Sequence, residues 1–100
     1  MNDAIVEAIK LSAYRASGIE GAVTFGLPDP LVFKMKADEL YEQNKANNII
    51  YTLDLPKLMD EISKFIDKMI SKYSIDIDPN QAKVKAYNTA ATVYNHYLRK

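Results

Sequence analysis

The chain has 100 residues, of which 48% are hydrophobic and 26% are charged. This composition is typical of a globular protein rather than a disordered one, and we expect residues 1–100 to form one domain with a modest core. The 13 basic and 13 acidic residues balance, which disfavours a protein that follows a nucleic-acid backbone with excess positive charge. There is no cysteine, so disulfides, thiolate metal sites and cysteine nucleophiles are excluded.

The first residues do not have the pattern of a secretory signal. Asp3 stands where a signal peptide carries positive charge, and Glu7 and Lys10 interrupt the apolar residues that follow. No apolar run approaches the roughly 20 residues that a membrane-spanning helix needs. We therefore expect a cytoplasmic protein without a membrane segment.

A first helix is predicted over Asn2–Ser17. Asn2 or Asp3 can accept hydrogen bonds from the free amides of the first turn, and Gly18 can take the left-handed conformation that commonly follows a helix. An irregular segment rich in glycine and proline comes next, at about residues 19–28.

A second helix is predicted from Pro30 to about Asn47, with Asp29 as its N-cap and proline at its first position. The alternative is a hairpin at about residues 22–36, which would make the fold α+β. It is suggested by apolar residues that alternate with their neighbours. These residues are Val23, Phe25, Leu27, Leu31, Phe33 and Met35.

The third helix is predicted over Leu55–Tyr73, after a short strand or extended connector at residues 49–53. Asp54 caps this helix, and Pro56 lies in its first turn. Its apolar residues repeat at spacings of three and four and form one stripe. They are Leu58, Met59, Ile62, Phe65, Ile66, Met69, Ile70 and Tyr73.

The fourth helix is predicted over Asn80–Leu98, and two neighbouring apolar rows cover half of its cylinder. The first row is Val84, Tyr87, Ala91, Tyr94 and Leu98. The second row is Ala86, Ala90, Val93 and Tyr97. One neighbour in a small bundle does not need so wide an apolar arc, so we expect part of it to be covered by a partner or by a second copy.

No catalytic residue, metal ligand or cofactor site is expected. His96 is the single histidine and lies on the polar face of the fourth helix, so we interpret it as solvated. Asp38, Glu39 and Glu42 are interpreted as a solvated face of the second helix. The glycines near residues 18–26 lack the lysine and preceding strand of a phosphate-binding loop.

Residues 76–80 resemble the start of a calcium loop, because aspartate and asparagine occupy alternate positions. The required glycine is replaced by Gln81, and the closing glutamate by Tyr87. We therefore interpret Asp78, Pro79 and Asn80 as a turn and a helix start.

The sequence thus predicts a mostly α domain of four helices. Its expected function is a non-enzymatic protein–protein interaction, as an adaptor, inhibitor or structural subunit that self-associates. Tyrosine is enriched at such interfaces. The predicted partner-binding residues are Tyr87, Ala91, Tyr94, Tyr97 and Leu98. A small nucleic-acid-binding regulator is the alternative, although the balanced charge makes nucleic acid an unlikely partner.

Overall fold

A computed structural model of the chain describes residues 3–19, 29–50 and 52–98. It contains four helices in these ranges: α1 (Ala4–Ser17), α2 (Pro30–Ala46), α3 (Leu55–Tyr73) and α4 (Pro79–Leu98). The prediction of a mostly α domain with four helices is confirmed, and each predicted helix boundary is met within about two residues.

Each helix begins directly after an aspartate whose side chain accepts a hydrogen bond from a backbone amide of the first turn. The four aspartates are Asp3, Asp29, Asp54 and Asp78. Because the first amides of a helix have no partner within it, these carboxylates stabilise the chosen starting points. Proline at the first position of α2 and of α4 costs no helical hydrogen bond.

A residue with positive φ follows three of the described helices, directly after α1 and α3 and one residue beyond the C-cap of α2. Gly18 follows α1 at φ 92°, Asn48 follows α2 at φ 55° and Ser74 follows α3 at φ 51°. After α3, the amide of Ile75 bonds the carbonyl of Ile70 at 3.1 Å, which is the long hydrogen bond of a Schellman motif. A Cβ at position 18 would meet the Ile77 side chain at an ordinary 3.6 Å, so glycine is needed there for its backbone conformation.

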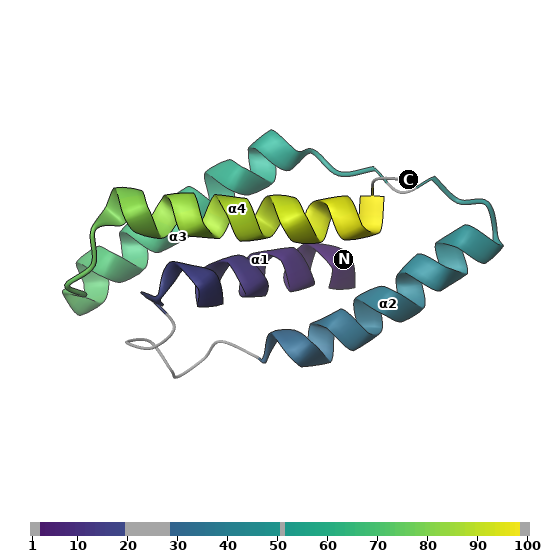
Figure 1. The fold of residues 1–100 in the computed structure, drawn as a ribbon, viewed down its shortest axis with the longest axis horizontal. Helices are drawn as coiled ribbons and strands as arrows, with labels where there is room; N and C mark the ends of the chain where they lie inside the picture. The colour runs from purple at the N-terminus through teal and green to yellow at the C-terminus, as the bar shows by residue number, and fades with distance from the viewer. Residues whose placement is uncertain (1–2, 20–28, 51, 99–100) are drawn as a thin grey trace.

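The centre of the fold is α1, which the other three helices surround. In Figure 1, α4 and α2 run on opposite sides of α1 and antiparallel to it, and α3 passes behind. Buried residues therefore occur all round α1, as expected for a helix inside a core. They are Ile5, Ala8, Ile9, Leu11, Ser12, Ala13, Tyr14 and Ser17.

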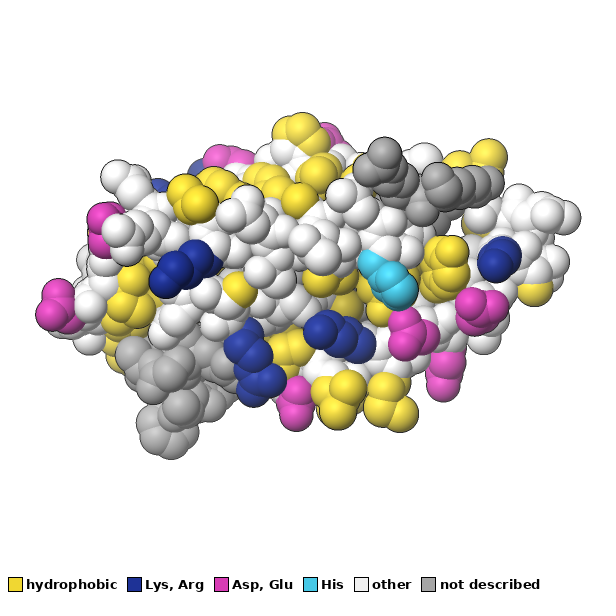
Figure 2. Space-filling model, viewed as in Figure 1, with side chains coloured by type: hydrophobic (Ala, Val, Ile, Leu, Met, Phe, Trp, Pro, Cys, Tyr) yellow, Lys and Arg dark blue, Asp and Glu magenta, His cyan; other side chains and the backbone are white. Residues whose placement is uncertain are grey.

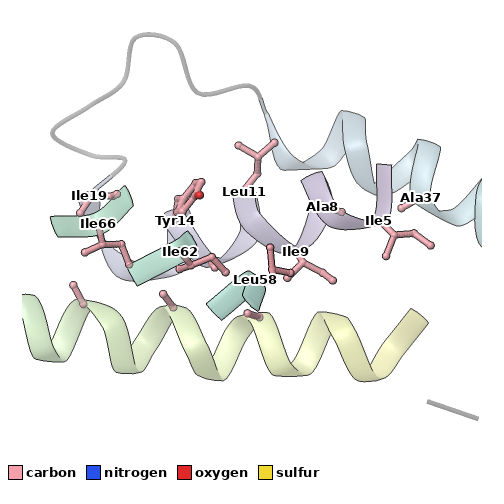
Figure 3. Close-up of a cluster of buried hydrophobic side chains, with 14 of the residues drawn as sticks. Ile5, Ala8, Ile9, Leu11, Tyr14, Ile19, Ala37, Leu58, Ile62 and Ile66 are labelled. Carbon is pink, nitrogen blue, oxygen red and sulfur yellow. The ribbon is translucent and has the colours of Figure 1, made fainter. Parts of the chain in front are cut away.

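Small residues of α4 and large residues of α3 complete this core. Ala82, Ala86 and Ala90 are fully buried, which lets the backbones of α1 and α4 approach closely. Figure 3 shows Leu58, Ile62 and Ile66 of α3 at the side chains of α1. The stacking of Phe65 on Tyr14, with ring centroids 4.2 Å apart, adds a specific contact between α3 and α1.

The second helix packs on the core through one side, where Phe33, Leu40 and Tyr41 are partly buried. Pro30 and Ala37 are its buried residues, and Figure 1 shows its C-terminal half extending past the end of α1. This projection fits the elongated shape of the molecule, which measures 46 × 24 × 20 Å.

The hairpin alternative is wrong, because Leu31, Phe33 and Met35 all lie within α2. Its first half, around Val23–Leu27, lies outside the described residues. Residues 49–50 and 52–54 form an irregular connector, and no strand occurs in the parts of the chain that the structure describes. An aspartate N-cap followed by proline stabilises the helix start, and that preference prevails over the alternation of apolar residues.

Candidate interaction surfaces

The structure sets the rotation of α4 about its axis, which periodicity had left open. The row that faces the core consists of Ala82, Ala86, Ala90, Val93 and Tyr97. The other apolar row lies to the side: Val84 is 56% exposed, and Tyr87, Ala91 and Tyr94 are half-buried. The side chain of Leu98 lies outside the described residues. Three of the five predicted partner-binding residues therefore share one partly open surface.

Tyr97, another of the predicted partner-binding residues, is instead only 6% exposed. Its hydroxyl donates a hydrogen bond to Oδ1 of Asp38 at 2.7 Å and lies 3.4 Å from the backbone carbonyl of Lys34. Burial raises the pKa of the Tyr97 phenol above its usual value, and the hydrogen bond to Asp38 raises it further. Tyr97 thus joins α4 to α2 within the chain.

Two further rings extend this contact between α2 and α4. The Tyr41 ring meets the Tyr97 ring edge-on at a centroid distance of 5.9 Å, and the His96 ring lies 4.7 Å from that of Tyr97. His96 is exposed, as predicted. The described residues hold no group of three or more histidine, aspartate or glutamate side chains that could bind a metal ion. This arrangement of rings packs two helices together and does not resemble a catalytic constellation.

The predicted acidic face of α2 is exposed at Asp38, Glu39 and Glu42. The hydrogen bond from Tyr97 gives Asp38 a structural role that the sequence did not indicate. Glu39 and Glu42 are free of ion pairs with any residue in the described part of the chain. Asp38 therefore links α2 to α4, whereas the other two carboxylates remain available to a partner.

A surface that the sequence analysis missed lies on the outside of α2. Leu31 is 61% exposed, Val32 is 50% exposed and Met35 is 62% exposed. We call these three side chains the α2 outer face. Val32 and Met35 project from the side roughly opposite Pro30 and Ala37, which are the buried residues of α2, and Leu31 lies on the flank beside them. The sequence does contain a sign of this surface, because apolar residues occur on two sides of the predicted second helix and only one side can face the core.

The α2 outer face continues into the acidic residues of the same helix. Five residues of α2, two of them from the outer face, follow one another at spacings of three and four and form one stripe along the helix. Such a stripe has the geometry of a seam between two helices. The stripe is Val32, Met35, Glu39, Glu42 and Ala46. Figure 2 shows hydrophobic side chains over the first turns of α2, along the lower edge, and acidic side chains farther along it.

A shallow depression lies at the start of α4. Its lining residues are Asn80, Gln81, Val84 and Lys85, and its volume is about 260 Å³. Small-molecule sites usually exceed about 300 Å³ and are lined by converging elements, whereas this depression is lined by two turns of one helix. The preceding aspartate, Asp78, caps α4 through the amide of Asn80, which confirms a turn and helix start in place of a calcium loop.

Within the described residues, no helix is both long enough and apolar enough to cross a membrane. No family model matches this chain, and no curated protein or solved structure matches it either. A functional proposal therefore depends on the chain's own surfaces, among which the α2 outer face places three exposed apolar side chains together on one helix.

Proposed function

We propose that this protein is a non-enzymatic helical interaction protein, an adaptor, inhibitor or structural subunit, that binds a protein partner through the α2 outer face. The observation that carries the proposal is the exposure of Leu31, Val32 and Met35 next to one another on a helix whose other side already packs on the core. Contiguous exposed apolar side chains are typical of protein interaction sites.

The position of these side chains allows binding to be separated from stability. Leu31 and Met35 are exposed, so their replacement by polar residues should change the free energy of unfolding by less than about 0.5 kcal/mol. The same replacement removes the apolar surface on which a partner would pack.

The test compares the wild-type protein with a Leu31→Ser, Met35→Ser variant. Each is used to capture proteins from an extract of the source organism, and circular dichroism checks that both remain folded. We expect the variant to lose a specific partner that an Ile50→Ser control, at an exposed apolar residue outside both helical surfaces, retains. Equal capture by the wild type and the folded α2 variant would count against the proposal.

Self-association through α4 is a second proposal, supported by the open row at Val84, Tyr87, Ala91 and Tyr94. Sedimentation equilibrium should show a concentration-dependent dimer that a Val84→Lys, Ala91→Lys variant cannot form. A monomer at all concentrations of the wild-type protein would remove this proposal and leave the one on α2 intact.

Nucleic-acid binding is the weaker alternative. Lys64 pairs with Asp60 at 2.9 Å, and Lys83 pairs with Asp67 at 2.8 Å, so acidic neighbours offset these lysines. A DNA titration at low salt that shows binding with a steep salt dependence would favour this alternative. The cytoplasmic location stays a prediction, which cell fractionation can check.

A further inference from the structure

We infer that the occupant of α2 is a basic amphipathic helix from another protein, with apolar residues along one half of its contact stripe and Lys or Arg along the other. This inference rests on the proposed function, because it names the partner chemistry of the same surface. Its basis is the stripe on α2, whose first half is apolar at Val32 and Met35 and whose second half is acidic at Glu39 and Glu42.

The apolar half gives the partner a place to pack. A helix laid along α2 would cover Val32 and Met35 with its own apolar side chains, as in other complexes in which an amphipathic helix fills an apolar surface. Leu31 lies beside them and widens this contact. The spacing of three and four residues keeps the stripe facing one neighbour along about four turns of α2.

The acidic half determines the charge of the partner. Glu39 and Glu42 are exposed and make no ion pair with any residue that the structure describes. The nearest lysines in sequence, Lys36 and Lys45, lie about a quarter-turn to the side of the stripe, and the ammonium of Lys36 lies over the Phe33 ring, 5.5 Å from its centroid. A facing Lys or Arg would therefore meet two carboxylates that make no ion pair with the described residues, with the two lysines beside the stripe rather than on it.

A second copy of α2 does not fit this surface. Parallel pairing would place Glu39 and Glu42 against the same carboxylates of the other copy, and like charges there repel. Antiparallel pairing would place them against Val32 and Met35, where a helix contact would bury charge on an apolar surface. Both arrangements disfavour symmetric pairing, so the stripe favours a partner of different sequence.

The experiment uses two synthetic helical peptides of about 18 residues built on alanine and glutamine. The basic peptide carries leucine at the contact positions of one half and arginine at those of the other. The acidic peptide is identical except that glutamate replaces arginine. Binding to the full chain is measured by fluorescence anisotropy at low and at physiological salt, and amide chemical-shift changes identify the surface that is occupied.

We expect the wild-type protein to bind the basic peptide and to bind the acidic peptide about tenfold more weakly. A Glu39→Lys, Glu42→Lys variant should reverse this preference, and salt should reduce the difference for both proteins. The matched control is a Glu61→Lys, Asp76→Lys variant, which makes the same change of charge at two exposed acidic residues outside α2 that form no ion pair with the described residues. This control should keep the wild-type preference.

Two results would overturn the inference in distinguishable ways. If the Leu31→Ser, Met35→Ser variant loses both peptides but the Glu39→Lys, Glu42→Lys variant keeps the wild-type preference, the charge assignment is wrong and the proposed function stands. If the apolar variant binds the basic peptide as tightly as the wild type does, the peptide occupies another surface. Both the inference and its basis in the α2 outer face then fail.

Discussion

The hydroxyl of Tyr97 donates a 2.7 Å hydrogen bond to the carboxylate of Asp38, and this contact joins α4 to α2 through two residues that are 59 positions apart in the sequence. Tyr97 is buried whereas Asp38 is exposed, so the bond lies at the boundary between core and solvent. It adds a polar contact to the apolar packing of α2, in which Ala37 is buried and Phe33, Leu40 and Tyr41 are partly buried.

A Tyr97→Phe variant should remain folded and lose about 1 kcal/mol of unfolding free energy, because it removes one hydrogen bond and keeps the ring. Urea unfolding of this variant, of Asp38→Ala and of the double variant measures the coupling between the two side chains. We expect a coupling of about 1 kcal/mol. Additive effects would show that the bond contributes nothing in solution.

The protein should lose stability at alkaline pH through Tyr14 and Tyr97. Burial raises the pKa of both phenols, and nearby carboxylates raise it further. An unfolded tyrosine loses its proton near pH 10, whereas the folded protein retains these two protons to higher pH. Unfolding then releases protons, so the stabilisation is complete below about pH 10 and is lost as pH rises through the folded pKa.

Urea unfolding between about pH 8 and about pH 11 tests this dependence. Lysines titrate in the same range, so the informative comparison is between variants. Tyr97→Phe should reduce the alkaline slope, and Tyr73→Phe at an exposed position should not. Equal slopes for the two variants would contradict the assignment to Tyr97.

Two adjacent alanines of α4 should respond differently to enlargement. Ala90 is fully buried towards α1, whereas Ala91 is half-buried in the open row. Ala90→Leu should destabilise the fold by about 1–3 kcal/mol through overpacking, and Ala91→Leu should cost less than about 0.5 kcal/mol. The two substitutions have the same effect on intrinsic helix propensity. Thermal unfolding measures the difference, and equal losses would contradict the rotation of α4.

Backbone amides of α2 should exchange with solvent faster than those of α1. Two residues of α2 are buried, against eight in α1, so opening of α2 exposes less of the core than opening of α1 does. Hydrogen exchange measured by mass spectrometry or NMR should detect this difference, and Tyr97→Phe should accelerate exchange in α2 while leaving α3 unchanged. Protection of α2 equal to that of α1 would show that the two helices open together.

Local signals in the sequence were sufficient to predict the helices. For α3, Asp54 and Pro56 mark the start and a regular apolar stripe runs to Tyr73, so the predicted and observed limits are the same. The hydrogen bonds that cap a helix join a side chain to a backbone amide two or three residues away. Both partners are therefore neighbours in the sequence, and the start of the helix can be predicted from it.

The contacts between helices could not be predicted in the same way. On α4, both apolar rows have helical spacing, and the alanine row faces α1 because small side chains permit close approach. The Tyr97–Asp38 bond leaves no local pattern, since its two residues come together only when α2 and α4 pack. The α2 outer face was missed for a related reason: which apolar side of α2 is buried depends on where α1 lies.

The central position of α1 also affects how a newly made chain can fold. This helix is synthesised before α2, α3 and α4, yet it needs all three to cover its apolar surface. Its closest packing is with α4, which is the last of the four helices to leave the ribosome. Until then α1 lacks its main partner, so we expect productive folding to begin only once α4 has emerged.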